Sequence, residues 1–238
     1  MKVFFQYSSG ILVFAILLFC NGCSERDDSY FPMTEGISWR YNIKMDTIDG
    51  PTIQKYFVSS IGQENLDGED ISVFQSLTGT QILYSVTDEG IQRLGYRVKD
   101  GQQVDKIDDN FLELPKQIEK GVVWESEETT ELLAMKEPAE RRNLELLATI
   151  PVKNEIVATD EVVKVIAGKF ENCVHIKTTG SEFNSNNRYI GRTLVQIEID
   201  RWYAPGIGLL KTERNETTTS AKLDKANRKM ELTAISYQ

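Results

Sequence analysis

Apolar and polar residues alternate along most of the chain after residue 36. In ISWRYNIKMDT (37–47) every second residue from Ile37 to Met45 is apolar, and the intervening positions are polar or charged. The segment TLVQIEI (193–199) repeats this spacing at Val195, Ile197 and Ile199. Successive side chains of a β-strand point to opposite faces, so this alternation predicts strands with one buried face and one solvated face.

Short segments rich in glycine and aspartate separate these runs. DG at 49–50 and LDGED (66–70) are two of them, and both residue types suit tight turns between antiparallel strands. The alternation weakens in two places, where we expect one helical turn within 100–120 and a short helix within 128–147. About a dozen short strands therefore predict a mainly β fold, an antiparallel, curved half-barrel or sandwich-like sheet with few short helices.

One spacing occurs twice in the predicted β-rich domain, 36–238. Gly36 and Trp39 are three positions apart, as are Gly121 and Trp124, and a proline lies a few residues upstream of each glycine. Two similar halves, about 36–115 and 116–238, would explain the repeat. Chance would explain it equally well, because one spacing and two residue types are little evidence.

The N-terminus has the pattern of an export signal. The apolar run from Gly10 to Cys20 follows Lys2 and contains no charge. It is shorter than the approximately 20 residues that a membrane-spanning helix needs, and it suits the apolar core of a secretory signal peptide. We therefore predict a signal peptide over 1–22.

Gly22 followed by Cys23 resembles the cleavage site of bacterial lipoproteins. The resemblance implies that the signal is removed before Cys23, that the Cys23 thiol is diacylated, and that 23–35 forms a lipidated N-terminus and tether. It also implies a membrane partner and a place in the cell envelope, on the outer membrane in a Gram-negative host. Cys20 fits the lipid site less well, because no small residue precedes it. An ordinary secreted protein or a single N-terminal anchor is the alternative.

Charge excludes one class of partner. The chain has 27 basic and 36 acidic residues, a net charge of −9. Loss of 1–22, with Lys2 and no acid, leaves 26 basic residues against 36 acidic ones, a net charge of −10. An acidic body disfavours binding to nucleic acid and to anionic headgroups. We predict no nucleic-acid partner.

The sequence shows no catalytic, cofactor or metal motif. His175 is the single histidine, and Cys173 shares its strand face, but a zinc site needs three or four ligands. The nucleophile-elbow pattern G-x-S-x-G is absent, as are the phosphate-binding and dinucleotide-binding glycine motifs. LDGED and DKIDDN (105–110) lack the spacing of an EF-hand calcium loop. A carboxylate pair for glycan hydrolysis stays open, because such a pair is defined by its separation in space.

Aromatic residues, proline and glycine gather in RWYAPGIGLLKTE (201–213). We interpret it as strand, turn and strand: Pro205 ends the first strand, and Gly206 and Gly208 take positive φ. Neighbouring Trp202 and Tyr203 then point to opposite faces of the sheet. The alternative is a platform on which a ligand stacks. The candidate ligand contacts are four aromatic residues: Trp202, Tyr203, Trp39 and Trp124.

This turn also carries a family resemblance. The pattern G-x-F-x-x-C at 168–173, followed by WYAPGxGLxK at 202–211, resembles uncharacterised bacterial secreted proteins and lipoproteins, for which it implies no activity. At the level of architecture such proteins are similar to the lipoprotein-localisation-factor (LolA/LolB-like) superfamily. That similarity implies an open β-barrel that wraps a few helices around an apolar cavity.

These observations favour a membrane-anchored lipoprotein that acts as a non-enzymatic binding or assembly module of the cell envelope. Its expected partner is an apolar ligand or an envelope protein. Three alternatives stay open at this point: a hydrolase with a carboxylate pair, a carrier of apolar ligands or lipoproteins, and a purely structural envelope component.

Overall fold

The computed structural model describes residues 29–47, 50–98, 105–133, 148–184, 190–223 and 226–237, with the backbone alone for 105–110. The described residues form twelve strands and no helix: β1 (Ile37–Thr47), β2 (Gly50–Leu66), β3 (Glu69–Ser76), β4 (Gln81–Val86), β5 (Gly90–Arg97), β6 (Asp105–Pro115), β7 (Val123–Thr129), β8 (Thr149–Val165), β9 (Gly168–Asn184), β10 (Thr193–Ala204), β11 (Gly208–Thr218) and β12 (Ala226–Tyr237). The predicted mainly β fold is confirmed.

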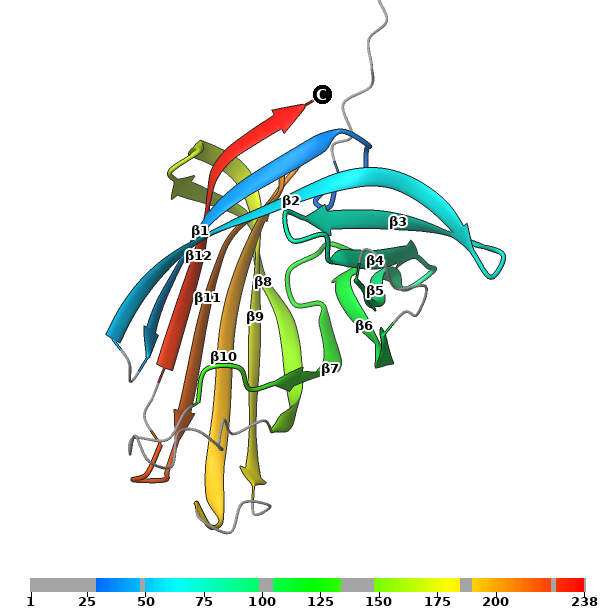
Figure 1. Ribbon diagram of the computed structural model, residues 1–238. Coiled ribbons are helices and arrows are strands. Elements are labelled where there is room, and N and C mark those ends of the chain that lie inside the picture. The colour runs from blue at the N-terminus through cyan, green and yellow to red at the C-terminus, as the bar shows by residue number, and fades with distance from the viewer. Residues whose placement is uncertain are drawn as a thin grey trace, which may run out of the picture.

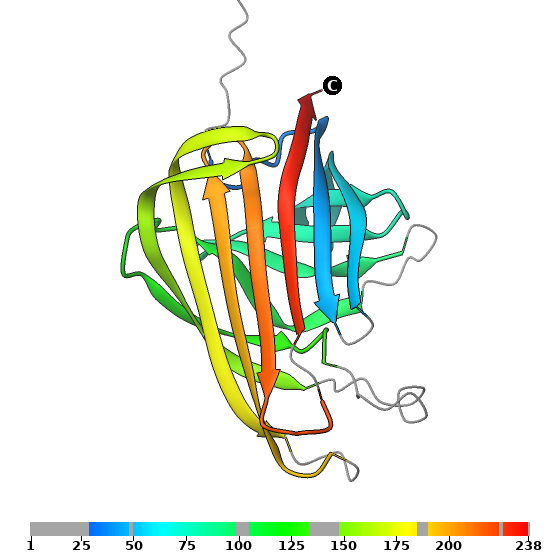
Figure 2. The same ribbon diagram turned by 90° about the vertical axis from the view of Figure 1, so that its left-hand side faces the viewer.

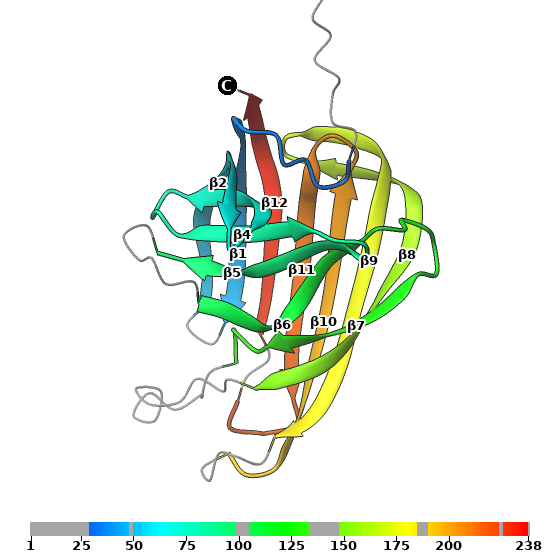
Figure 3. The ribbon, with the colours of Figure 1, turned by 90° about the vertical axis from the view of Figure 1, so that its right-hand side faces the viewer.

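All twelve strands belong to one antiparallel sheet. Its order is β6-β5-β4-β3-β2-β1-β12-β11-β10-β9-β8-β7, so consecutive strands pair, except for the two edge strands β6 and β7, and β1 also pairs with β12. The sheet curls until the edge strands β6 and β7 approach each other (Figures 1 and 3). The indole N–H of Trp124 on β7 donates to Leu112 O on β6 at 3.2 Å. The result is a nearly closed barrel.

The barrel is flattened because its two halves cross. Strands β8 to β12 run side by side along the long axis, whereas β3 to β6 cross that direction steeply (Figure 1). The bend lies in the 17-residue strand β2, where the pairing with β3 shifts between Ser60 and Gln63. A bulge of this kind kinks a strand and increases its twist. The inner faces of the two halves therefore enclose the core between them.

The predicted alternation is confirmed in two strands. In β1 the side chains of Ile37, Trp39 and Tyr41 are buried. In β10 the same holds for Val195, Ile197 and Ile199, which keep 2% exposure or less.

Two expectations are corrected. The strands are not all short, because β2, β8 and β9 each have 17 residues. Residues 105–115, inside the segment expected to hold a helical turn, form strand β6. The β5–β6 pairing shifts register twice, so the buried Phe111 and Leu114 stand three positions apart and hide the period of two. Of the short helix expected over 128–147, residues 134–147 lie outside the described residues.

Residues 29–35, which we call the strap, pack against one end of the barrel. They run from the β10–β11 turn to the start of β1 (Figure 3). Gly206 N donates to Ser29 O at 2.9 Å, and the Ser60 hydroxyl donates to Met33 O at 3.0 Å. The segment assigned to the tether thus includes residues that contact the barrel. The predicted signal peptide and Cys23 lie outside the described residues.

The β8–β9 hairpin bends over the outer face of the same end (Figure 2). Ala167 N at its tip donates to Leu232 O on β12 at 3.1 Å. This fold buries Cys173, a free thiol, beneath the hairpin. No helix in the described part of the chain has the length and apolar character to cross a membrane.

Candidate functional site: an aromatic pocket inside the barrel

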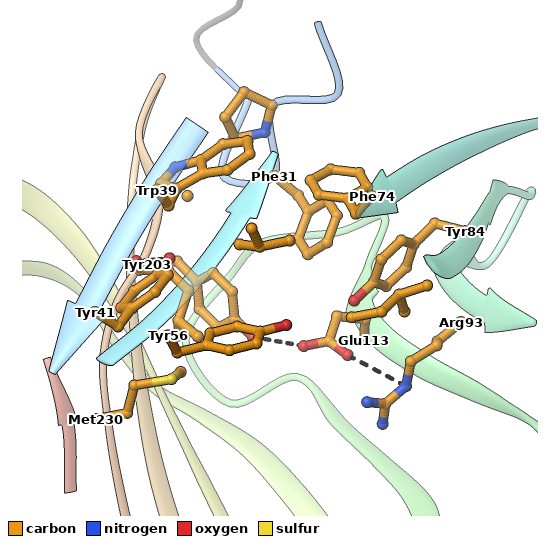
Figure 4. A pocket seen from close by; sticks show the side chains of 15 residues that line it. Phe31, Trp39, Tyr41, Tyr56, Phe74, Tyr84, Arg93, Glu113, Tyr203 and Met230 are labelled. Carbon is orange, nitrogen blue, oxygen red and sulfur yellow. Dashed lines mark hydrogen bonds and ion pairs between the residues drawn. The ribbon is translucent and has the colours of Figure 1, made fainter. Parts of the chain in front are cut away.

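A cavity of about 190 Å³ lies inside the barrel, beneath the strap. About half of the residues that line it are aromatic, and they come from the strap and from both crossing halves of the sheet (Figure 4). There are seven of them: Phe31, Trp39, Tyr41, Tyr56, Phe74, Tyr84 and Tyr203. We call this cavity the aromatic pocket.

The rings of the pocket contact one another at the strap side. The Phe31 ring lies 4.8 Å from the Tyr84 ring and 5.6 Å from the Phe74 ring, between centroids. Trp39 stacks on Phe74 at 5.6 Å with an angle of 23° between the ring planes. Such tilted and offset pairs are favourable arrangements of aromatic quadrupoles. They pack the rings against one another at the strap side of the wall.

The polar atoms of three wall residues are occupied by the protein itself. The Trp39 indole N–H donates to Ile207 O at 2.7 Å, and the Tyr41 hydroxyl donates to Leu209 O at 2.9 Å. The Tyr203 hydroxyl donates to Glu113 Oε1 at 2.9 Å. Burial raises the pKa of Tyr41, and burial together with the charge of Glu113 raises the pKa of Tyr203. These side chains therefore present ring faces to a ligand.

Arg93 and Glu113 supply the polar side of the pocket. The Arg93 Nε lies 4.0 Å from Glu113 Oε2. Burial lowers the pKa of Arg93, but the charge of Glu113 outweighs it, so the pKa is raised and Arg93 stays charged. Arg93 Nη1 donates to the Tyr96 hydroxyl at 2.8 Å, and the guanidinium lies 4.2 Å from the Phe111 ring centre. Arg93 Nε is a buried donor without an acceptor among the described residues.

Beyond Arg93 the cavity continues as a groove of about 590 Å³. Tyr56, Arg93 and Glu113 line both spaces. The lining of the groove carries four basic and four acidic side chains. They are Arg93, Arg201, Arg214 and Arg228, and Glu113, Glu127, Glu128 and Glu131. We call it the charged groove.

Glu128 is the centre of an ion network in the charged groove. Its two oxygens accept from Arg201 Nη2 at 2.5 Å and from Arg214 Nη1 at 2.9 Å. Burial works to raise the pKa of Glu128, but the two guanidinium groups outweigh it and hold the pKa below its ordinary value. A general acid needs the opposite shift. This carboxylate is therefore built to stay ionised.

Glu216 extends the network to the backbone. Its side chain is fully buried, and its oxygens accept from Arg214 Nε at 2.8 Å and from the backbone N–H of Glu131 and Leu132 at 2.9 and 3.0 Å. Strand β11 is thereby fixed to the start of the β7–β8 connection. Both oxygens of Glu216 have hydrogen-bond donors within the protein, so this part of the network stabilises the fold.

A second charged cluster lies outside the barrel. His175 Nδ1 is 3.1 Å from Glu161 Oε1, and His175 Nε2 is 2.7 Å from Asp200 Oδ1. The His175 ring stacks on Trp202 at 4.3 Å, and the Trp202 indole N–H donates to Glu161 Oε2 at 2.8 Å. Both ring nitrogens of His175 thus face carboxylates, and no hydroxyl or thiol nucleophile stands on either. Within the described residues no group of three or more His, Cys, Asp or Glu side chains is arranged for a metal ion.

The four aromatic candidates separate in space. Trp39 and Tyr203 line the aromatic pocket. Trp202 points to the opposite face, toward His175, and Trp124 packs where β6 and β7 approach each other. The structure thus brings two of the four together.

Most residues of the pocket are not among the sequence candidates, and three of them are instructive: Phe31, Arg93 and Glu113. Phe31 was placed in the tether, although SYFPM (29–33) is apolar and aromatic compared with the acidic residues before it, and that change was the available signal. Arg93 and Glu113 alternate with neighbours in a way that resembles any solvated strand face. No local pattern shows that they meet.

The chain was compared with known proteins at the levels of family, sequence and structure. No family model matches it, and no curated protein matches it in sequence. Two solved structures are similar. One is a protein described as exported, with a YmcC-like fold, from Bacteroides fragilis: 15% identity, 87% of this chain and 98% of that chain covered, TM-score 0.40. The other is a protein described as a lipoprotein, from Parabacteroides distasonis: 14% identity, the same coverage of both chains, TM-score 0.42. The likeness to the lipoprotein-localisation-factor superfamily is not confirmed by these comparisons.

Proposed function

We propose that this protein is a lipid-anchored binding protein of the cell envelope, and that its barrel takes up the apolar part of a small amphipathic ligand. The aromatic pocket carries the proposal: seven aromatic side chains surround about 190 Å³. An engineered apolar cavity of roughly 150 Å³ in another protein binds benzene. The aromatic pocket accordingly has room for a single ring or a short stretch of alkyl chain.

The chemistry of the pocket narrows the ligand class. Its wall offers ring faces, because the Trp39, Tyr41 and Tyr203 donors already have protein acceptors. Arg93 Nε is the buried donor that a ligand oxygen would satisfy. A ligand with an apolar end and a hydroxyl, carbonyl or ester oxygen fits both features. Its polar end would lie toward the charged groove.

The envelope location rests on the N-terminal sequence. Removal of 1–22 and acylation of Cys23 would place two or three acyl chains on the mature N-terminus, and two such chains hold a protein stably on a membrane. An outer-membrane position applies to a Gram-negative host.

Native mass spectrometry of residues 24–238, purified gently from the natural host, tests the binding proposal. We expect an adduct of fixed stoichiometry whose mass identifies a small amphipathic molecule. Met230→Trp places a larger side chain in the pocket and should remove the adduct. Val162→Trp adds the same ring on the exposed β8–β9 hairpin and should keep the adduct. A bare mass in every preparation, together with no binding of the uncharged dye N-phenyl-1-naphthylamine, would refute the proposal.

A further inference from the structure

A second cavity lies on the other side of the strap. It is a groove of about 680 Å³ between the strap, the β4–β5 turn and the β6–β7 connection, and we call it the outer groove. Its wall is mostly apolar, with Val86, Ile91, Leu114, Pro115 and Ile118, and the exposed pair Lys116 and Asp88 stands at its edge.

Phe31 separates the outer groove from the aromatic pocket. In the part of the chain that the structure describes, it is the one side chain that lines both cavities. On the pocket side its ring contacts Phe74 and Tyr84, and Figure 4 shows it projecting from the strap into the space between the two sheet halves. A change in the rotamer of this single ring would join the two cavities into one passage with apolar walls.

The strap around Phe31 is held at its ends. Ser29 O accepts from Gly206 N, and the Tyr30 hydroxyl donates to Asn172 O at 3.0 Å. Pro32 packs beside Gly208. The Phe31 ring is held by apolar contacts and carries no hydrogen-bonding group, so its displacement costs apolar contact and leaves no polar group unpaired. The backbone of the strap can therefore stay in place while the ring moves.

The outer groove also lies at the membrane-facing end if Cys23 carries the anchor. Five residues, 24–28, lie between Cys23 and Ser29, which lines the groove. The six steps along the chain from Cys23 to Ser29 span at most about 20 Å. The opening of the groove is then within roughly that distance of the bilayer surface, where molecules with long apolar chains reside.

We infer that the outer groove is a second subsite for the distal part of the ligand's apolar chain, and that Phe31 is the gate between it and the aromatic pocket. The inference rests on the proposed function and deepens it. The ligand class becomes a single-chain amphipath whose chain is longer than the aromatic pocket. Its oxygen lies at Arg93, its proximal methylenes lie in the aromatic pocket, and its distal methylenes pass Phe31 into the outer groove.

A chain-length series on residues 24–238 tests this inference, with 1-hexanol and 1-decanol as probes measured by calorimetry. Each further buried methylene contributes about 0.8 kcal/mol, about a fourfold gain in affinity. In the wild type part of that gain is spent on moving Phe31. Phe31→Ala should therefore raise the affinity ratio of 1-decanol to 1-hexanol by about tenfold or more, and Phe31→Leu should raise it less.

Two controls make the result specific. Phe183→Ala deletes an equal ring from an exposed site away from the pocket and should keep the wild-type ratio. Adding Ile118→Asp to Phe31→Ala places a charge in the outer groove and should abolish the gain for 1-decanol while keeping binding of 1-hexanol. An unchanged ratio in Phe31→Ala, or a gain that survives Ile118→Asp, overturns the gate and leaves the proposed function intact. Absence of binding of either alcohol to all variants overturns both.

Discussion

Two glutamates of this protein each hold two cations, but in different surroundings. Glu128 lies inside the barrel with Arg201 and Arg214, and its side chain is 10% exposed. Glu213 lies on the outer face with Lys211 and Lys229, and its side chain is 34% exposed. The distances between charged atoms are similar, at 2.5–2.9 Å for Glu128 and 2.6–2.7 Å for Glu213. The pair therefore isolates the effect of burial.

We predict that Glu128→Gln destabilises the protein far more than Glu213→Gln. Removing one member of a buried ion pair costs roughly 3–5 kcal/mol, because the remaining charges are left uncompensated. An exposed pair contributes about 0–1 kcal/mol. Urea unfolding at pH 7, followed by circular dichroism, gives both values. Equal losses would show that the Glu128 network is solvated and plays no special part.

The same glutamate predicts a pH dependence. In the folded state the pKa of Glu128 lies below its ordinary value of 4.5, because two arginines outweigh the effect of burial. Such a group stabilises the fold fully above the ordinary value, and the contribution is lost as pH falls through the lower, folded-state pKa. The stability gap between wild type and Glu128→Gln should therefore be constant from pH 7 to about 5 and narrow below 4.5. A gap that widens on acidification would contradict the sign of this linkage.

Single residues show where sequence reasoning succeeds and where it ends. Trp39 and Tyr203 could be selected from the sequence because large aromatics in alternating strands are rare and visible. Their shared position in one pocket could not be predicted. The two residues stand 164 positions apart in the sequence, and only the folding of the sheet brings them together. Arg93 and Glu113 carried no local sign of function. Their place in the pocket depends on the residues packed around them, and most of those residues are distant in sequence.

At the scale of elements, the backbone conformation of the β10–β11 turn follows from its local sequence. Gly206 and Gly208 have φ of +69° and +88°, as the sequence predicted for a turn and a bulge, and the β10–β11 pairing shifts next to them. The region of positive φ favours glycine because a Cβ atom is crowded there. The sequence did not reveal that Gly208 also leaves room for the strap. A Cβ there would stand 3.3 Å from Pro32 Cδ of the strap.

Gly208→Ala and Gly121→Ala form a matched pair for this turn. Gly121 has φ of +90°, and no atom within 4 Å would meet its Cβ. Both substitutions should cost about 1–2 kcal/mol of backbone strain. Gly208→Ala should cost more, because it also pushes on Pro32, and it should change the near-ultraviolet circular dichroism of the neighbouring Trp39. An equal cost in urea unfolding, with an unchanged spectrum, would mean that the strap yields freely.

Strand prediction failed where the strands are irregular. Period-two burial holds from Ile37 to Tyr41 in β1 and from Thr193 to Ile199 in β10. In β6 two shifts of register against β5 move the buried residues off that period, where the sequence predicts a helical turn instead of a strand. Bulges depend on the partner strand, so a single sequence does not display them. The same irregularity places Arg93, at one of these shifts, beside Glu113.

At the scale of the whole molecule, the suggested halves correspond to six strands each, β1–β6 and β7–β12. The first strand of each half follows a glycine with nearly equal φ, +88° at Gly36 and +90° at Gly121. Gly36 N donates to Ser60 O on the next strand at 3.0 Å, and Gly121 N donates to Ile156 O on its next strand at 2.8 Å. These correspondences support a duplication, which stays a hypothesis.

A lipid anchor on Cys23 stays a prediction, and it would place the membrane attachment at the end of the barrel that the strap covers. If Cys23 is the lipidated residue, Cys23→Ser should abolish incorporation of radiolabelled palmitate and move the protein from the membrane fraction to the soluble fraction. Cys20→Ser should leave both unchanged, because Cys20 is removed with the signal peptide. Binding of an apolar probe by the purified body, residues 24–238, should be the same for either parent chain, since the pocket is built from residues 31–230.

Palmitate retained by Cys23→Ser and lost by Cys20→Ser would move the anchor to Cys20 and lengthen the spacer before Ser29 by three residues. The pocket would then stand about 10 Å farther from the bilayer at full extension, and the supply of chains directly from the membrane would lose its geometric support.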